Sequence, residues 1–203
     1  MITVLFQGDS LTDGLRSRED LTDLGQWYAK RVAGDLELKY PGKYTFINRG
    51  VAGNRVVDVY ARMKADIINL KPDIMTISIG GNDVAAEYVR QNGVPVEKYE
   101  RIYNMLLDEV QAALPNIKFI FMGSYNRASA SEKAIKLQPE LAERAAIAKK
   151  IAEQRGCPYI DLQTIFNEAE ARGVTHLTYD DVHPDYAGSE LIKNALMAEI
   201  EKL

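Results

Sequence analysis

Residues 73–79 read DIMTISI, an almost uninterrupted apolar run that decides the fold class. Such a run is typical of a central parallel strand that helices cover on both faces. Pro72 stands directly before the run and is expected to stop the preceding helix. Gly80-Gly81-Asn82-Asp83 follows it, so a polar segment is expected at the carboxyl end of the strand.

On both sides of this segment, apolar runs alternate with amphipathic stretches. The apolar runs predict four further strands, at residues 2–6, 44–48, 117–122 and 158–162. In the amphipathic stretches, apolar residues recur every three to four positions, which predicts helices. The expected helices span residues 24–38, 56–70, 96–114, 139–156 and 186–203, with a short helix after residue 162. Residues 7–23 and 124–136 are expected to form loops.

Five strands separated by helices predict right-handed βαβ units and a doubly wound sheet. We therefore expect an α/β fold, a three-layer α/β/α sandwich around a five-stranded parallel sheet. Pro139 is expected as the first residue of its helix, and Gly156 as the glycine just beyond the end of that helix. The chain has 203 residues without a repeat or linker, so a single domain over residues 1–203 is expected.

The charge balance argues against nucleic acid or an anionic membrane as a partner. The chain carries 25 Lys and Arg against 29 Asp and Glu, a net charge of −4. No apolar run approaches the roughly 20 residues that span a bilayer. Residues 1–6 lack a basic segment, so we interpret them as a strand and not as a signal peptide, and expect a cytoplasmic location.

Cysteine and histidine are scarce. Cys157 is the only cysteine, so no disulfide can form within the chain. His176 and His183 are the only histidines, whereas a zinc site takes three or four His, Cys or carboxylate ligands. We therefore expect no metal cofactor.

Ligands bind outside the carboxyl ends of the strands in open parallel sheets, so we expect the polar clusters at these positions to form a site. There are four such clusters: Gly8-Asp9-Ser10-Leu11, Gly50-Val51-Ala52-Gly53-Asn54-Arg55, Gly80-Gly81-Asn82-Asp83 and Asp180-Asp181-Val182-His183.

The residue types in these clusters suit nucleophilic catalysis. A serine such as Ser10 needs a base to take its proton, and imidazole is the side chain that can do so near neutral pH, which points to His183. Asp180, three residues earlier, is placed to orient that ring. The Ser10 N–H, the Gly53 N–H and the Asn82 amide are candidate donors to a developing oxyanion.

In this order and spacing, the four clusters resemble the signature blocks of the SGNH, or GDSL, hydrolase family, and the resemblance covers essentially the whole chain. It implies a flavodoxin-like sheet and ester hydrolysis through an acyl-serine, without a metal or organic cofactor. Its residues would be Ser10, Asp180 and His183 as the triad, with Ser10, Gly53 and Asn82 as the oxyanion hole. A small-molecule ester is the partner that this implies, and a homo-oligomer stays open.

Residues 48–58 and 71–84 look like intracellular bacterial carbohydrate esterases, notably acetylxylan esterases. This resemblance suggests an ester with a short acyl chain, such as an acetylated carbohydrate, as the substrate. One departure bears on the acyl pocket. Such esterases often carry Trp shortly after the Gly-x-Asn-Asp block, where this chain has Val84-Ala85-Ala86.

Several of these residues also have purely structural interpretations. Ser10 or Asn82 would serve as a helix cap, and Gly53 would simply allow a positive φ. Asp9 is expected to hold the serine turn, and Asp181 competes with Asp180 as partner of the histidine. Supporting or substrate-binding roles are assigned to Asp9, Asn54 and Arg55, the last of which would alternatively form an ion pair within its loop.

Other functions use the same residues differently. An acyltransferase, a lysophospholipase or a thioesterase would employ the same triad. A metal-dependent phosphoesterase would need more ligands than two histidines allow, and a non-enzymatic binding module would not need Ser10, His183 and Asp180 to meet. No serine lies in Gly-x-Ser-x-Gly, and no Gly-x-Gly-x-x-Gly is present, so standard α/β-hydrolase and dinucleotide-binding interpretations are disfavoured.

Overall fold

The computed structural model describes residues 1–127 and 131–203, which form a sheet of five parallel strands and the helices around it. The strands are β1 (Ile2–Gly8), β2 (Tyr44–Asn48), β3 (Ile74–Ser78), β4 (Lys118–Met122) and β5 (Tyr159–Ile160). Their order is β2-β1-β3-β4-β5, and all neighbouring pairs are parallel. This is the flavodoxin-like order, so the predicted fold class is confirmed.

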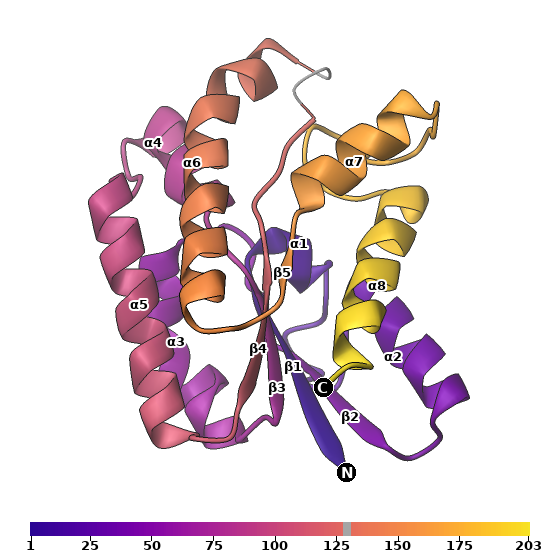
Figure 1. The fold of residues 1–203 in the computed structure, drawn as a ribbon. Helices are drawn as coiled ribbons and strands as arrows, with labels where there is room; N and C mark the ends of the chain where they lie inside the picture. The colour runs from indigo at the N-terminus through magenta and orange to yellow at the C-terminus, as the bar shows by residue number, and fades with distance from the viewer. Residues whose placement is uncertain (128–130) are drawn as a thin grey trace.

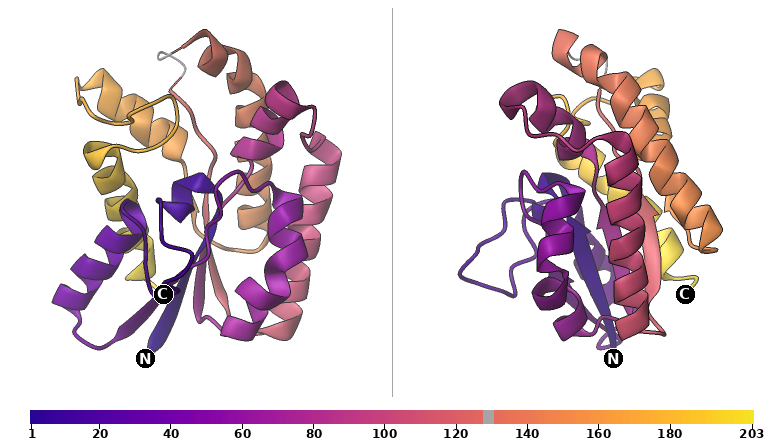
Figure 2. Two further views of the ribbon diagram at one scale, coloured as in Figure 1. Left: turned by 180° about the vertical axis from the view of Figure 1, so that it is seen from behind. Right: turned by 90° about the vertical axis from the view of Figure 1, so that its left-hand side faces the viewer.

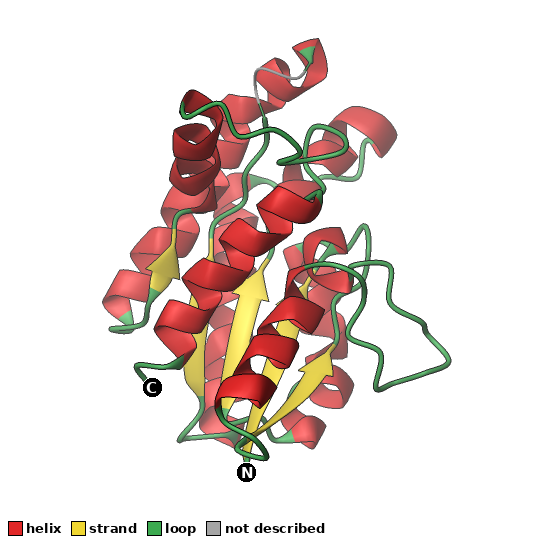
Figure 3. Cartoon of the chain, turned by 90° about the vertical axis from the view of Figure 1, so that its right-hand side faces the viewer, coloured by secondary structure: helices red, strands yellow, loops and turns green. Residues whose placement is uncertain are grey.

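Helices cover both faces of the sheet and produce the three layers seen in Figures 1 and 2. One face carries α2 (Tyr28–Lys39), α7 (Leu162–Ala171) and α8 (Tyr186–Ile200). The other carries α3 (Val56–Asp66), α5 (Val96–Ala113) and α6 (Glu132–Gln154). Two more helices begin just beyond strand ends: α1 (Ser10–Asp13) and α4 (Gly81–Arg90). The strand arrows in Figure 3 all point toward one end of the sheet.

Each face of the sheet has its own hydrophobic core, because strand side chains alternate between faces. In β1, Val4 and Phe6 pack beneath α2, α7 and α8, while Leu5 packs beneath α3, α5 and α6. In β3, Ile74 faces the first cluster, and Met75 and Ile77 face the second. The DIMTISI run is therefore almost uninterruptedly apolar because both of its faces are buried.

The direction of winding reverses between β1 and β3, which are neighbours in the sheet. The chain leaves β1 toward β2 on one side, and later continues from β3 toward β4 and β5 on the other. Such a switch point opens a crevice at the carboxyl ends of the two strands. Ser10 follows β1 and Asn82 follows β3, so the two side chains lie on the two sides of this crevice.

The predicted start of α6 is wrong. The helix begins at Glu132 after Ser131, whose side chain accepts a hydrogen bond from the Ala134 N–H, and Pro139 lies inside it. The added turns are anchored by Leu137 and Leu141 packing on α4, in a small cluster separate from the two main cores. The predicted loop at 124–136 is therefore helical from Glu132, and its residues 128–130 lie outside the described residues. Gly156, with φ at +63°, follows the helix end as predicted.

The ten-residue helix α4 was not among the expected helices, and the other differences are smaller. The loop predicted at 7–23 contains α1, and the predicted helix 56–70 ends at Asp66 before a 3₁₀ turn, η1 (Ile68–Leu70). β5 is shorter than predicted and lies at the edge of the sheet, where it pairs with β4. In the part of the chain that the structure describes, no helix is both long and apolar enough to cross a membrane.

Candidate active site

A sharp turn holds Ser10 at the carboxyl end of β1. The Asp9 side chain caps α1 by accepting a hydrogen bond from the Leu11 N–H at 3.1 Å, and Ser10 is the first residue of the helix. A Cβ atom at position 8 would lie only 2.3 Å from the Ser78 carbonyl oxygen in β3, so glycine alone fits there. Ser10 is thus not the helix cap.

Ser10, His183 and Asp180 form one chain of hydrogen bonds. His183 Nε2 lies 2.8 Å from Ser10 Oγ, and His183 Nδ1 lies 2.7 Å from Asp180 Oδ2. The fold brings together a hydroxyl and an imidazole that are 173 positions apart in the chain. A hydroxyl, an imidazole and a carboxylate in this order are the groups that let serine lose its proton to a base.

The carboxylate of Asp180 is fixed on both oxygens. Its Oδ1 accepts hydrogen bonds from the N–H groups of Val182 at 2.8 Å and His183 at 2.6 Å. Partial burial acts to raise the pKa of Asp180, but the hydrogen bonds from the His183 ring and these N–H groups outweigh it and hold the pKa below its ordinary value. An ionised Asp180 favours the tautomer with a proton on Nδ1, which leaves Nε2 to accept from Ser10.

The loop and neighbouring rings also orient His183. Trp27 lies against the imidazole with ring centroids 5.4 Å apart, and Tyr179 stacks on it at 5.7 Å. Asp181, the other candidate partner, instead accepts a hydrogen bond from the Ser131 hydroxyl at 2.5 Å. The geometry therefore favours Asp180 over Asp181 as the orienting residue.

The three candidate oxyanion donors come from three segments. The Ser10 N–H is at the first position of α1, where the helix provides no acceptor. Gly53 has φ at +80° and is the third residue of a turn that the Asn54 N–H closes on the Val51 carbonyl oxygen. Asn82 is the second residue of α4, while Gly80 occupies the N-cap, so Asn82 is not the helix cap.

Asp9 holds the amide of Asn82. Asn82 Nδ2 donates to Asp9 Oδ2 at 3.3 Å, and the Asp9 side chain is buried at the base of the site. Burial raises the pKa of Asp9 to about 6, against the lowering effect of its hydrogen bonds. Asp9 thus keeps the Asn82 amide beside the serine turn.

Asn54 and Arg55 are engaged within the protein. Asn54 Oδ1 accepts a hydrogen bond from Arg62 at 2.8 Å. The Arg55 guanidinium pairs with Asp58 at 2.9 Å and donates to Asn92 at 2.8 Å. Of the two interpretations of Arg55, these contacts favour the ion pair that fixes its loop.

A cavity of about 340 Å³ opens onto Ser10 and His183. Its wall includes the polar side chains of Asn126, Lys133 and Asp181 and the apolar side chains of Ala85, Leu137 and Leu141. Among the residues that the structure describes, no group of three or more His, Cys, Asp or Glu side chains is arranged to hold a metal ion.

The sequence profile of the GDSL-like lipase/acylhydrolase family matches residues 6–191. The chain belongs to this family. This GDSL-family protein is also 31% identical to an acetylxylan esterase from Geobacillus stearothermophilus, over 97% of the present chain and 93% of that esterase.

Solved structures agree with the family assignment. A crystal structure of a catalytic mutant of an acetylxylan esterase from Geobacillus stearothermophilus is 30% identical, with a TM-score of 0.86 over 98% of this chain and 94% of that one. A putative GDSL-like lipase from Parabacteroides merdae is 27% identical, with a TM-score of 0.90 over 98% and 95%. The present chain is a GDSL-type serine esterase or acylhydrolase, which acts on carboxylic esters.

Two buried carboxylates of this GDSL-family site, Asp13 and Asp83, were assigned no role from the sequence. Asp13 accepts a hydrogen bond from the Ala52 N–H, and both oxygens of Asp83 lie 3.1 Å from the Val56 nitrogen at the start of α3. Asp83 stands in the Gly-Gly-Asn-Asp block, which was the only signal available for it. Burial raises the pKa of Asp83 to about 7.

The raised pKa of Asp83 predicts that the protein loses stability as the pH rises toward neutrality. Below an ordinary Asp pKa of 3.8, the group is protonated in both states, whereas near pH 7 the unfolded chain has released a proton that the folded chain still binds. We expect this group to lower the free energy of unfolding by on the order of 4 kcal/mol across that interval. Denaturant unfolding measured at several pH values, for wild type and Asp83→Asn, tests this.

In Asp83→Asn, the free energy of unfolding should decline less steeply with rising pH than in wild type, because the amide cannot ionise. Asp9 adds a smaller decline of the same sign, since its pKa is raised to about 6. Asp20→Asn is the matched control. Hydrogen bonds from Thr22 lower the pKa of this exposed carboxyl below its ordinary value, so it is already ionised across the pH interval in which Asp83 titrates. Equal declines in Asp83→Asn and wild type would contradict the prediction.

Proposed function

We propose that the protein is a serine esterase that hydrolyses short-chain carboxylic esters through an acyl-serine intermediate, with acetylated carbohydrates as the first substrate class to test. The observation that carries this proposal is the hydrogen-bonded chain from Ser10 to His183 to Asp180, at 2.8 and 2.7 Å. It opens on a cavity large enough for a small ester.

In the acylation step, Ser10 Oγ attacks the ester carbonyl carbon while His183 Nε2 takes the hydroxyl proton. The negative charge moves to the carbonyl oxygen, where the Ser10 N–H, the Gly53 N–H and the Asn82 amide are the proposed donors. The bond to the alcohol then breaks, and His183 returns the proton to the departing oxygen. Asp180 stabilises the imidazolium that exists between these two proton transfers.

In the deacylation step, water replaces the alcohol. His183 takes a proton from the water as its oxygen attacks the acyl carbon, and the same three donors are proposed to bind the second oxyanion. Collapse of this intermediate breaks the bond to Ser10 Oγ, and His183 returns the proton to the serine. The products are the free alcohol, the carboxylic acid and the original enzyme.

The substrate class is supported by two observations. The 31% identical relative is an acetylxylan esterase. The cavity at Ser10 combines an apolar side, formed by Ala85, Leu137 and Leu141, with polar groups of Asn126 and Lys133. Apolar side chains suit an acyl chain, and hydrogen-bonding side chains suit the hydroxyl groups of a sugar.

A hydrolysis panel of p-nitrophenyl esters from acetate to laurate, with acetylated xylose and xylooligosaccharides, tests the proposal. We expect kcat/KM to be highest for acetate and to fall with acyl-chain length, and we expect acetate release from the sugars. EDTA should leave the rates unchanged, whereas a metal-dependent phosphoesterase would lose activity. A maximum at medium or long chains would contradict the short-chain assignment, and release of phosphate from phosphoesters would contradict the reaction class.

A further inference from the structure

The turn that carries the Gly53 N–H determines where that donor points. Residues 51–54 form a turn closed by a hydrogen bond from the Asn54 N–H to the Val51 carbonyl oxygen at 3.1 Å, with Gly53 at φ +80°. A positive φ at the third residue is what a type II turn requires, whereas a type I turn has a negative φ there. The two types differ by a flip of the central peptide, here the Ala52–Gly53 peptide. That flip reverses the direction of the Gly53 N–H.

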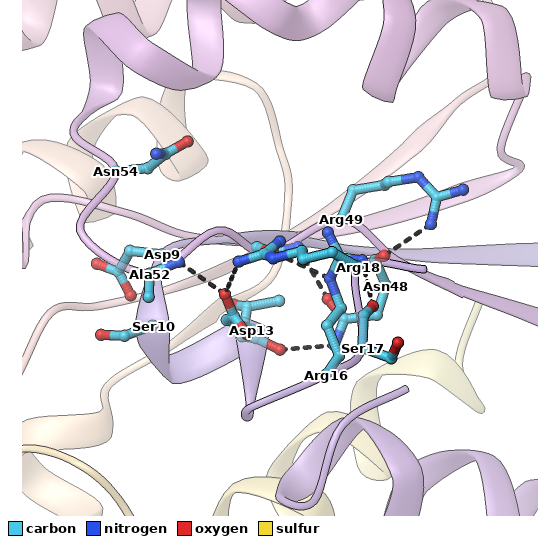
Figure 4. A network of polar contacts seen from close by, with 12 residues as sticks. Asp9, Ser10, Asp13, Arg16, Ser17, Arg18, Asn48, Arg49, Ala52 and Asn54 are labelled. Carbon is cyan, nitrogen blue, oxygen red and sulfur yellow. Dashed lines mark hydrogen bonds and ion pairs between the residues drawn. The ribbon is translucent and has the colours of Figure 1, made fainter. Parts of the chain in front are cut away.

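A buried carboxylate holds this turn from the side of the nucleophile. Asp13 Oδ2 accepts a hydrogen bond from the Ala52 N–H at 2.8 Å, and Asp13 is 4% exposed. The same oxygen pairs with the guanidinium of Arg18, as the dashed lines in Figure 4 show. Asp13 is the last residue of α1, the four-residue helix that begins with Ser10.

The segment just before the turn is clamped by the same group of residues. The Gly50 carbonyl oxygen accepts hydrogen bonds from Arg16 Nε and Arg18 Nη1, both at 3.1 Å. A Cβ atom at position 50 would lie 2.3 Å from the Asp13 nitrogen, so this backbone rests directly on α1. The Val51 N–H donates to the Gly8 carbonyl oxygen at 3.0 Å.

We propose that Asp13, supported by Arg18, is a positioning residue: by accepting from the Ala52 N–H it anchors the Val51–Ala52 peptide and thereby fixes the place of the turn that presents the Gly53 N–H to the oxyanion. This rests on the proposed function, in which Gly53 is a donor. Asp13 is not among the residues that line the cavity at Ser10, and it acts through the turn without touching substrate. One short helix thereby carries the nucleophile and fixes a second donor relative to it.

The first test compares Asp13→Ala with wild type in steady-state kinetics on p-nitrophenyl acetate. We expect kcat to fall roughly 10- to 100-fold, less than the 10²–10³ cost of deleting a donor, because a turn released from Asp13 still occupies its original position part of the time. KM should stay within about threefold, because ground-state binding does not use the oxyanion contact. Asp13→Asn, which keeps an oxygen for the Ala52 N–H, should recover most of the rate.

Asp23→Ala is the matched control. Asp23 also accepts hydrogen bonds from backbone N–H groups in a neighbouring loop, those of Ser17 at 2.7 Å and Gly25 at 3.0 Å. Within the part of the chain that the structure describes, Asp23 makes no hydrogen bond to residues 50–53. Its kcat should stay within about twofold of wild type. A fall in kcat as large as that of Asp13→Ala would overturn the proposal, because it would show a general effect of loosened loops.

A double-mutant cycle with Gly53→Ala tests whether Asp13 acts through Gly53. A Cβ atom at position 53 would meet nothing within 4 Å, so Gly53→Ala acts through its positive φ and not through a clash. If Asp13 acts by way of the Gly53 N–H, the double variant should be about as slow as the slower single variant. If the losses in kcat of the two single variants multiply in the double variant, the proposal is overturned.

The outcomes separate this proposal from the proposed function. If Gly53→Ala retains kcat within twofold while Ser10→Ala is inactive, the conformation of this turn does not set the rate, so the positioning role of Asp13 fails and the acyl-serine mechanism stands. If Gly53→Ala is slow and Asp13→Ala is not, only the positioning role of Asp13 fails. If Asp13→Ala does not fold, the cycle is run with Arg18→Met in its place. The Arg18 side chain is 48% exposed, so its loss leaves the core intact.

Discussion

Replacing Ser10 with alanine is expected to lower kcat for p-nitrophenyl acetate by roughly 10⁴- to 10⁶-fold, the range seen when a triad serine is removed. The reason is geometric. Ser10 Oγ is the hydroxyl 2.8 Å from the imidazole of His183, so alanine leaves the base with no nucleophile to activate. Binding of the ester and the stability of the fold should change little, because Asp9 and not Ser10 caps α1.

The measurement pairs steady-state rates with mass spectrometry of the intact protein after a brief reaction with a slow ester substrate. Wild type should gain the mass of one acyl group, and Ser10→Ala should gain none. Ser17→Ala is the matched control, since the hydrogen bonds of its hydroxyl, among the residues that the structure describes, come from the backbone N–H groups of Glu19 and Asp20. Retention of more than one tenth of the wild-type rate in Ser10→Ala would contradict the acyl-serine mechanism.

Replacing Asp180 with asparagine is expected to lower kcat by roughly 10³- to 10⁴-fold. Asp180 Oδ1 accepts two backbone hydrogen bonds, so the oxygen of an asparagine would stay there and its NH₂ group would face His183 Nδ1. Nδ1 would then accept a hydrogen bond, and the ring proton would reside on Nε2. In that tautomer Nε2 cannot accept the proton of Ser10.

Asp181→Asn is the matched control for this variant. The two aspartates are neighbours in sequence, but the Asp181 carboxylate contacts Ser131 and not the imidazole. Its kcat should fall less than about tenfold. Equal losses in the two variants would show that the charge of the loop matters and not the tautomer of His183. Circular dichroism and thermal unfolding establish that both variants fold.

Much of this fold was predictable because it follows from local patterns. Apolar runs such as residues 73–79 predict buried strands, and alternation with helices predicts a parallel sheet. Since parallel strands share one carboxyl edge, the polar clusters containing Ser10 and Asn82 had to lie near each other. The meeting of His183 with Ser10 was predictable only from the types of residue and their resemblance to a family.

The remaining features depend on contacts between distant segments, which no local pattern reports. The start of α6 was missed because Leu137 and Leu141 pack on α4, outside the main cores. Asp13 was not recognised because its partner, the Ala52 N–H, lies 39 positions away on another loop. A backbone N–H leaves no mark on residue identity, so a sequence carries no sign of such a hydrogen bond.

The imidazole and the carboxylate that orients it occupy a single four-residue stretch, Asp180 to His183, while the serine sits on the opposite wall. Any displacement of that stretch carries both groups together and leaves their mutual contact intact. The contact in the triad that is most easily broken is thus the hydrogen bond between the Ser10 hydroxyl and the His183 imidazole. On heating, enzymatic activity should therefore be lost at a lower temperature than the one at which the sheet unfolds, because separation of the two walls breaks this hydrogen bond first.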